Sequence, residues 1–248
     1  MIEMRGIEKR FGSKHVLRGV DLTIAKGESM VIIGGSGSGK SVTLKCVLGL
    51  LEPDGGEVRV DGERVDNRPR GDALLARFGM LFQGAALFDS LSVWENVAFR
   101  VRQDRSKSTE QCRAIAVDSL ARVGLSESIA DQFPAELSGG MQKRVGLARA
   151  IAAQPEIIFF DEPTTGLDPI MAGVINELIR ELVTEMGATA LTITHDMSSV
   201  RMIGDRVAML HNGVIQWQGP ADEMDRCDNA YIRQFVSGSE DGPIEALR

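Results

Sequence analysis

The sequence predicts an α/β protein with a parallel-sheet core interrupted by a helical insertion. Two short apolar runs, Met30–Ile33 and Ile157–Phe160, are unbroken, as expected of strands buried on both faces. Residues 84–156 between them are mostly helical in pattern. A further strand-like run, Thr189–Thr194, restores the alternation of strand and helix after the insertion. We therefore expect one domain, residues 1–248, with a core (1–87 and 157–236), a helical insertion (88–156) and a tail without periodicity (237–248).

Turn and cap residues give the expected elements in chain order. Ser108 or Thr109 can cap a helix that ends near Gly124, and its apolar face runs Cys112, Ile115/Ala116, Leu120 and Val123. Asn212-Gly213 between two apolar runs is a strong hairpin signal. The remaining elements are strands at 29–33, 57–60, 78–82, 157–160 and 189–194, helices at 41–51 and 174–186, and hairpin strands at 207–210 and 214–217.

Composition restricts the class of function. Hydrophobic residues make up 43% and charged residues 25%, which is ordinary globular usage. A net charge of −7 argues against a protein that grips DNA or RNA, because such binding neutralises phosphates. No apolar run approaches the roughly 20 residues that span a bilayer, and the N-terminus lacks a secretory apolar region, so we expect membrane contact only through partners. The cysteines, Cys46, Cys112 and Cys227, are odd in number and far apart, which favours reduced thiols without a disulfide or metal.

A glycine-rich loop follows the first apolar strand. Residues 34–41, Gly-Gly-Ser-Gly-Ser-Gly-Lys-Ser, fit the pattern G-x-x-x-x-G-K-[ST]. Backbone N–H groups at the glycines can wrap phosphate oxygens, and the N-terminus of the following helix adds partial positive charge. Lys40 would reach the β- and γ-phosphates, and Ser41 would offer a hydroxyl to Mg²⁺. A chance match in a glycine-rich chain is the alternative, and the strand before the loop and helix after it argue against that.

Two further polar positions follow buried strands. Asp161-Glu162 ends the second apolar run, at the edge where α/β sheets place ligands. Asp161 there could hold Mg²⁺ through water, and Glu162 could polarise an attacking water. His195 ends the later run and could reach the same crevice. The alternatives are a solvated turn before Pro163 and a structural histidine.

A second glycine-rich turn opens another helix. Ser138-Gly139-Gly140 precedes an apolar face of Met141, Val145, Ala148 and Ile151/Ala152. A flexible turn is the usual explanation of such a signal, but this one is also a second helix N-terminus with free amides and a hydroxyl. A subunit with one nucleotide has no evident use for two phosphate sites. We therefore expect the second site to complete a nucleotide bound to a twin chain.

These residues together resemble the ABC ATPase family. The matching elements cover nearly the whole chain in the family's order: residues 34–41, Gln83, Leu137–Gly140, Asp161-Glu162, Gly166-Leu167-Asp168 and His195. The resemblance implies a P-loop NTPase (RecA-like) core with N-terminal antiparallel β elements and an inserted helical lobe. It also implies a head-to-tail homodimer that buries two ATP molecules, each between a phosphate loop and the opposing Ser138-Gly139-Gly140.

The same resemblance assigns roles to residues of this chain. Glu162, His195 and Gln83 would be catalytic, and Ser41, Gln83 and Asp161 would hold Mg²⁺. Phe11 takes the place of the aromatic residue that stacks on adenine, with simple core packing as its alternative, and Asp168 would communicate across the interface. Together with these two, ATP would contact Gly34, Gly35, Ser36, Gly37, Ser38, Gly39, Lys40, Ser41, Val42, Ser138, Gly139 and Gly140.

Two stretches resemble a narrower group, the ATPases of Mla-type lipid transporters. They are residues 82–97 and the tail segment 238–244. This resemblance implies two permease subunits, an MCE-domain protein and a STAS-domain protein as partners, and a place at the cytoplasmic face of the inner membrane. It also implies a tail that crosses to the neighbouring ATPase; a disordered tail is the alternative. An apolar group just after Gln83 could receive a permease helix or could belong to the core of the helical lobe: Leu87, Phe88, Leu91, Val93 and Trp94.

Three other functions compete with this interpretation. A soluble ABC ATPase without a permease would share the motifs, but the doubled chains and long coiled-coil insertions of such proteins are absent here. A P-loop kinase for small molecules would not need Ser138-Gly139-Gly140 or Gly166-Leu167-Asp168. An ABC subunit for another cargo stays open, because the cargo touches other subunits.

Overall fold

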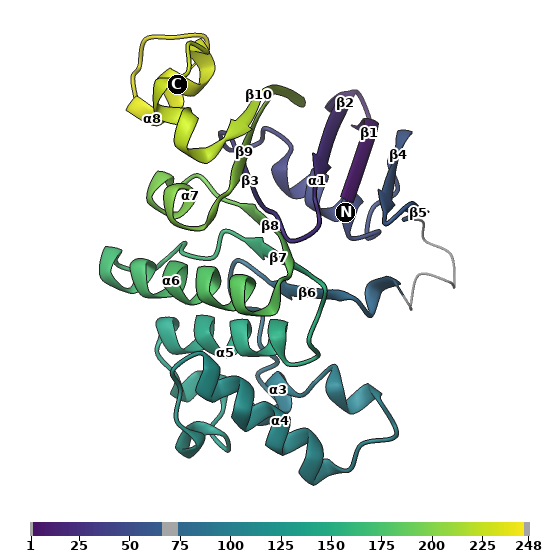
Figure 1. The fold of residues 1–248 in the computed structure, drawn as a ribbon, viewed down its shortest axis with the longest axis vertical. Coiled ribbons are helices and arrows are strands. Elements are labelled where there is room, and N and C mark those ends of the chain that lie inside the picture. The colour runs from purple at the N-terminus through teal and green to yellow at the C-terminus, as the bar shows by residue number, and fades with distance from the viewer. Residues whose placement is uncertain (1, 66–73, 246–248) are drawn as a thin grey trace. The chain divides into compact units, whose positions relative to one another are not determined.

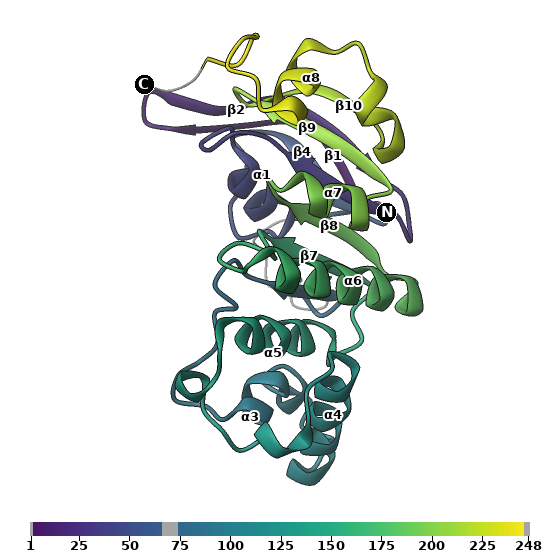
Figure 2. The ribbon, with the colours of Figure 1, turned by 90° about the vertical axis from the view of Figure 1, so that its left-hand side faces the viewer.

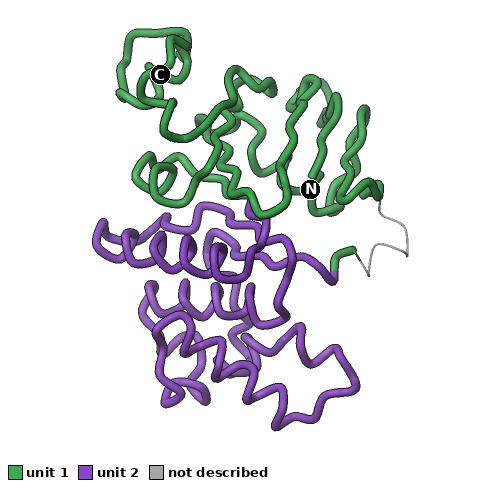
Figure 3. The backbone as a smooth tube through the Cα atoms, in the orientation of Figure 1, with its two compact units in different colours: residues 1–75, 191–248 green, residues 76–190 purple. Residues whose placement is uncertain are grey.

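The computed structural model describes residues 2–65 and 74–245. They form two compact units, residues 1–75 with 191–248, and residues 76–190 (Figure 3). The second boundary between the units falls inside strand β8 (Thr189–Ile193). Thr189 and Ala190 belong to the second unit, and residues 191–193 belong to the first. The last three residues of the predicted tail, 246–248, lie outside the described residues.

The first unit contains an antiparallel sheet with the strand order β2-β1-β4-β5. Alternate residues of β1 are buried, Ile2 and Met4 among them, which is the pattern of a sheet with one covered face. Figure 1 shows β1, β2 and β4 side by side. The predicted N-terminal antiparallel elements are therefore confirmed, and they are β1 (Ile2–Phe11), β2 (Lys14–Ile24), β4 (Gly55–Val60) and β5 (Glu63–Arg64).

Parallel pairing in the same unit involves β3 (Ser29–Ile33) and β9 (Arg206–His211). All five residues of β3 are buried, as the unbroken apolar run predicts. Strand β9 turns back into the antiparallel β10 (Val214–Pro220) through Asn212 and Gly213, whose φ angles are 49° and 76°. Two consecutive positive φ angles define the tight hairpin turn, so the predicted hairpin is confirmed.

Helices of this unit are α1 (Lys40–Val47), α7 (Met197–Ile203), the 3-10 segment η4 (Ala221–Arg226) and α8 (Ala230–Ser237). Helix α1 ends four residues before its predicted end. Gly49 has φ 67° there, and the amide of Leu50 donates to the carbonyl of Lys45 at 2.9 Å. This left-handed cap stops the helix and satisfies its last carbonyls.

The described part of the tail folds back onto α8. The side-chain amide of Gln234 accepts from the Ile244 amide at 2.7 Å, and donates to the Ile244 carbonyl at 2.9 Å and the Ser239 carbonyl at 3.2 Å. One side chain thus closes a loop of the tail that the sequence pattern left without structure.

The second unit pairs β6 (Phe78–Leu81) in parallel with β7 (Ile157–Asp161). Its helices are α3 (Val93–Val97), α4 (Thr109–Arg122), α5 (Gly139–Ile151) and α6 (Pro169–Met186), with 3-10 segments η1 (Val101–Gln103), η2 (Glu127–Ile129) and η3 (Pro134–Glu136). Figures 1 and 2 show α5 between α6 on one side and α3 with α4 on the other.

Helix caps explain where these helices begin. Ser108 caps α4, and its hydroxyl accepts from the amide of Gln111. The predicted apolar face of α4 is buried at Cys112, Ala116 and Leu120. Helix α6 begins five residues before its predicted start, because the Asp168 carboxylate accepts from the amides of Ile170 and Met171, each at 3.0 Å.

All three cysteines are free thiols, and Cys46 and Cys112 are buried. Across residues 2–65 and 74–245, no helix has both the length and the apolar content to cross a membrane.

Candidate functional site

The phosphate loop joins the buried strand β3 to helix α1 in the first unit. Gly34 has φ 154°, and a Cβ added there would lie 2.2 Å from the carbonyl oxygen of Leu210. The hairpin between β9 and β10 supports the loop from one side, because the Gly213 amide donates to the Ser38 carbonyl at 3.2 Å. Packing of this hairpin therefore holds the loop backbone at a position that only glycine fits.

The Lys40 side chain folds back onto the loop that precedes it. Its ammonium donates to the carbonyls of Gly34 at 2.7 Å and Gly35 at 3.0 Å, and the residue is buried. The Ser38 hydroxyl is also buried, and it has no hydrogen-bond partner among the described residues. A buried hydroxyl without a partner is costly unless another group satisfies it. A phosphate oxygen in the loop would supply that partner, so the loop fits the predicted nucleotide.

Ser41 follows at the first turn of α1, with its side chain exposed. A hydroxyl oxygen is the kind of hard donor that Mg²⁺ takes together with phosphate oxygens and water. Among the described residues, no group of three or more His, Cys, Asp or Glu side chains could hold a metal ion. Ser41 therefore offers one oxygen donor, and the roles predicted for Ser41, Gln83 and Asp161 at a Mg²⁺ ion stay predictions.

Two other predicted residues belong to the same unit. The amide of Thr194 donates to the carbonyl of Ile32 at 3.2 Å, which places exposed His195 beside the end of β3. The phosphate loop leaves β3 at that end, so the backbone brings His195 to the loop. Phe11 at the end of β1 is 49% exposed and lies 5.9 Å from the Lys9 ammonium. Phe11 is half exposed and therefore not a core residue, and its stacking on adenine stays a prediction.

In the second unit, the sheet register brings Gln83 next to Glu162. Strands β6 and β7 pair so that Leu81 lies opposite Phe160, and Gln83 and Glu162 each follow two residues later. Glu162 has φ 48°, a left-handed conformation that is uncommon outside glycine. Its carboxylate accepts from the Thr165 hydroxyl at 3.2 Å. Gln83 and Glu162 therefore emerge together at the edge of the sheet predicted for ligand chemistry.

Two cations of helix α5, the buried Lys143 and the half-buried Arg149, hold this pair and the loop that follows Gln83. The Lys143 ammonium donates to the carbonyl of Gln83 and, at 3.3 Å, to that of Glu162. Arg149 donates to the carbonyls of Ala85 and Ala86, both in left-handed conformations with φ 60° and 49°. Burial lowers the pKa of Lys143 and of Arg149, and the negative charges of Asp161 and Glu162 oppose the lowering at Lys143.

Sequence reasoning missed both cations, because it assigned α5 a single apolar face. The helix is buried on a second side as well, formed by Lys143, Gly146, Leu147 and Ala150. These residues recur at the three- and four-residue spacing of one helix face, and most of them are small or apolar. That spacing was the signal that could have revealed the second buried side.

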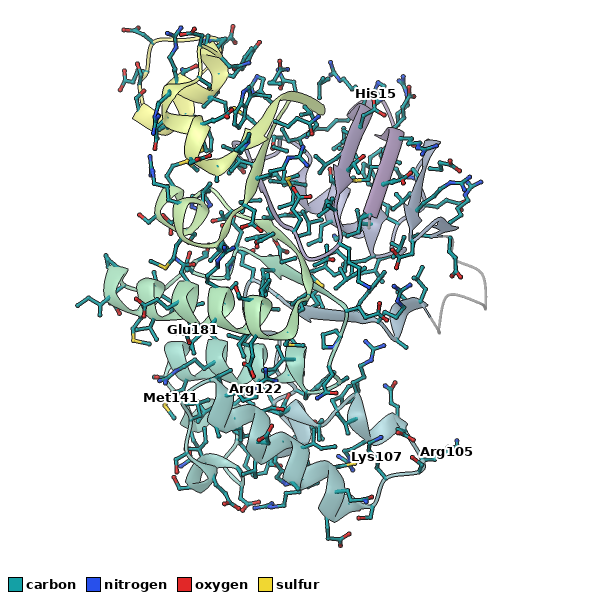
Figure 4. All side chains as sticks on the ribbon, viewed as in Figure 1. His15, Arg105, Lys107, Arg122, Met141 and Glu181 are labelled. Carbon is teal, nitrogen blue, oxygen red and sulfur yellow. The ribbon has the colours of Figure 1, made fainter. Side chains whose placement is uncertain are left out.

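The second glycine-rich turn lies at the N-terminus of α5. Ser138 caps the helix by accepting from the amide of Met141, which is labelled in Figure 4, at 3.3 Å. Ser138 and Gly139 are exposed. Helix α6 begins nearby, because the Met171 side chain would lie 3.0 Å from a Cβ on Gly140. Next to Met171, Ile170 is 80% exposed.

The apolar group after Gln83 divides between core and surface. Val93 is fully buried, whereas Phe88 is 43% exposed and stacks on Phe99, which is 40% exposed, at 4.6 Å between ring centroids. Buried Asn96 holds the intervening loop by donating to the carbonyls of Phe88 and Leu91, each at 3.0 Å. The predicted core role is therefore confirmed for Val93, and the contact with a permease helix stays a prediction for the exposed Phe88.

Comparisons with a family model and with known proteins agree on one family. A family model described as ABC transporter matches residues 17–165. The chloroplastic protein Trigalactosyldiacylglycerol 3 of Arabidopsis thaliana is 42% identical, over 98% of this chain and 75% of its own length. A probable ribonucleotide transport ATP-binding protein, mkl, of Mycobacterium tuberculosis is 40% identical, over 98% of this chain and 68% of its own length. The intermembrane phospholipid transport system ATP-binding protein MlaF of Escherichia coli K12 is 36% identical, over 98% of this chain and 91% of its own length.

A solved structure resembles most of the chain. It is the dimeric ATP-binding cassette MJ0796 in a post-hydrolysis state bound to ADP and Pi, with a TM-score of 0.81 and 33% identity over 89% of this chain and 99% of its own. The predicted fold class, an α/β P-loop NTPase, is confirmed by this similarity.

Proposed function

This chain belongs to the ABC transporter family and is an ATPase of that type, and on this premise we propose that it works as a head-to-tail homodimer that drives membrane permease subunits. The observation that carries the dimer is the exposed turn at Ser138 and Gly139, a helix N-terminus of the kind that binds anions, which belongs to a different unit from the phosphate loop. The exposed Ile170 next to it supplies apolar surface for an interface.

The roles in hydrolysis follow from the donors and acceptors at each position. Lys40 and the loop amides bind the phosphates, and the partner's Ser138 and glycine amides close on the γ-phosphate. Ser41, Gln83 and Asp161 would help to hold Mg²⁺, which when bound would supply positive charge against the phosphates. Glu162 accepts a proton from the attacking water, Gln83 orients that water, and His195 holds the γ-phosphate. Phe11 stacks on the adenine.

Closure of the dimer depends on the γ-phosphate in this mechanism. Each γ-phosphate collects donors from both protomers, so ATP binds the closed dimer better than the separated chains. Loss of the γ-phosphate removes that difference in affinity and opens the dimer. Opening and closing is the motion that a permease can use.

A complementation assay tests the shared site. Lys40→Ala disables a phosphate loop, and Ser138→Phe blocks the opposing turn; each variant alone should lose steady-state ATPase activity. In a mixture, a mixed dimer holds one site with both defects and one intact site. Half of the dimers are mixed and each has one working site, so we expect about a quarter of wild-type activity.

The double variant Lys40→Ala/Ser138→Phe is the matched control, because its dimers have no intact site and should stay inactive. If each nucleotide site lay within one chain, every chain in the mixture would carry a defect. An inactive mixture of stable, dimerising variants would therefore disprove the shared site.

For the permease contact we propose the exposed aromatic pair Phe88 and Phe99, with Phe82 at 39% exposure before Gln83. Exposed aromatic rings are favoured at protein interfaces. Phe82 directly precedes the proposed catalytic glutamine, and Phe88 lies five residues after it. Through this contact the ATPase would lie at the cytoplasmic face of the inner membrane without entering it. MCE- and STAS-domain proteins complete the proposed assembly.

For the cargo we propose phospholipid. The support is the resemblance of residues 82–97 and 238–244 to Mla-type ATPases and the phospholipid and glycerolipid terms in two relatives' names. The mkl relative, named for ribonucleotide transport, is the observation against it. Purification of the native complex tests the proposal: we expect a permease with MCE and STAS proteins and bound phospholipid. A permease with a soluble-solute binding protein would refute the lipid cargo while leaving the ATPase dimer intact.

A further inference from the structure

Lys143 is a buried lysine. Among the described residues, the hydrogen bonds of its ammonium all go to backbone carbonyl oxygens. The residue is 5% exposed. Its ammonium bonds the Gln83 carbonyl, 60 residues earlier, and the Glu162 carbonyl at 3.3 Å, 19 residues later. These two carbonyls belong to the proposed water-orienting residue and the proposed general base.

The arrangement is costly to maintain without a purpose, because burial disfavours the ammonium. Taking a charged amine out of water lowers its pKa, and the nearby charges of Asp161 and Glu162 oppose that shift only in part. Two directed hydrogen bonds to carbonyls satisfy the buried charge. A leucine or methionine would fill the same space without a buried charge but would leave both carbonyls without this donor.

The conformation of Glu162 makes its carbonyl bond important. Glu162 has φ 48°, and a non-glycine residue holds such an angle only where its surroundings require it. The Lys143 bond and the bond from the Thr165 amide, 3.2 Å, both end on the Glu162 carbonyl. The direction of the Glu162 side chain follows from this backbone conformation.

We propose that Lys143 is a positioning residue for ATP hydrolysis: it holds Gln83 and Glu162 side by side and ties both to helix α5. This inference rests on the proposed function, because α5 also carries the turn that meets the partner's nucleotide. Gly139 and Lys143 are four residues apart, about 6 Å along one rigid helix. A shift of α5 when the partner's ATP binds therefore moves the support of the chain's own catalytic pair.

The test compares Lys143→Met and Lys143→Arg with a control on the same turn of the helix, Arg144→Met. Arg144 donates to the Gly124 carbonyl at 3.2 Å, away from the catalytic pair. For Lys143→Met we expect kcat to fall roughly 10- to 100-fold, because misplaced catalytic groups lose rate without losing substrate affinity. Binding of a non-hydrolysable ATP analogue, measured by titration calorimetry, should stay within about twofold of wild type.

The conservative variant separates positioning from folding. Lys143→Arg keeps a buried cation with donors, so it should recover most of the lost kcat, and Arg144→Met should keep wild-type kcat. Melting temperatures of all variants are measured beside the rates. A wild-type kcat for Lys143→Met would overturn the inference. So would an equal loss of kcat in Lys143→Met and Arg144→Met that tracks a lower melting temperature in both variants.

Failure of the proposed dimer gives a different result. If the complementation assay restores no activity while Lys143→Met still loses kcat selectively, the shared site is wrong and the positioning role stands. If complementation succeeds and Lys143→Met is fully active, the dimer stands and the positioning role is wrong.

Discussion

At the scale of single residues, the phosphate loop shows two different reasons for glycine. At Gly34 there is no room, since an added Cβ would lie 2.2 Å from a backbone oxygen of Leu210. At Gly37 there is room, with nothing within 4 Å of an added Cβ, but φ is 74°. The first position is restricted by packing and the second only by backbone conformation.

The pair predicts unequal costs for the same substitution. Gly37→Ala should lower the free energy of unfolding by about 1–2 kcal/mol, the cost of a left-handed alanine. Gly34→Ala adds a clash with a buried backbone and should cost roughly 3 kcal/mol or more. Urea unfolding of the two variants measures the difference, and equal losses would contradict the described packing around Leu210.

At the scale of elements, the helical segment after Gln83 depends on one buried amide. Asn96 on α3 is fully buried, and it makes four hydrogen bonds to residues 88–92. The Phe88 amide donates to its oxygen at 2.7 Å, and its nitrogen donates to three carbonyls. This side chain thus fixes the loop that presents Phe88 to solvent.

Removing the amide should destabilise the second unit. Asn96→Ala leaves one donor and three carbonyls without this partner, so we expect a loss of roughly 3 kcal/mol of unfolding free energy. Asn229→Ala is the control: Asn229 caps α8 and donates one further bond, to the Gln216 carbonyl at 3.0 Å, so its loss should cost about 1–2 kcal/mol. Chemical denaturation distinguishes the two. Similar small losses would show that Asn96 does not support the loop.

Helix α5 illustrates how one element combines several tasks. Its N-terminus carries the exposed turn, one side packs toward α3 and α4, and the other contains Lys143 and the small residues Gly146 and Ala150 against β6. A Cβ on Gly146 would lie 2.9 Å from the side chain of Leu81 on β6. Close packing of this kind makes the helix move as a rigid body rather than bend.

At the scale of the whole molecule, the predicted residues divide between the two units. Phe11, residues 34–42 and His195 belong to the first, and Gln83, Ser138–Gly140, Asp161-Glu162 and Asp168 to the second. The proposed dimer adds a further level, because an intact nucleotide site then needs two chains.

Association of the chain should therefore depend on intact ATP. In Glu162→Gln the γ-phosphate is bound but not hydrolysed, so we expect saturating ATP with Mg²⁺ to convert the variant to dimer, whereas ADP leaves it monomeric. Analytical ultracentrifugation measures the two states. The control Lys40→Ala/Glu162→Gln lacks the phosphate ligand and should stay monomeric. A Glu162→Gln variant that binds ATP and remains monomeric would exclude a γ-phosphate-driven dimer.

Local patterns in the sequence determined much of this molecule. The phosphate loop, the caps at Ser108 and Ser138 and the hairpin at Asn212-Gly213 depend on neighbouring residues, so their chemistry can be predicted from a short window. The buried runs of β3 and β7 likewise predicted their strands. The early end of α1 at Gly49 and the early start of α6 at Asp168 were missed, although both depend on local caps.

Only the tertiary structure decided how distant residues support the catalytic pair. Gln83 and Glu162 lie side by side because β6 and β7 pair in one register, and a shift of that register would separate them. Lys143 reaches both carbonyls because a second face of α5 is buried beside this sheet. Contacts between residues 60 and 19 positions apart depend on how elements pack, and no local pattern in the sequence determines that packing.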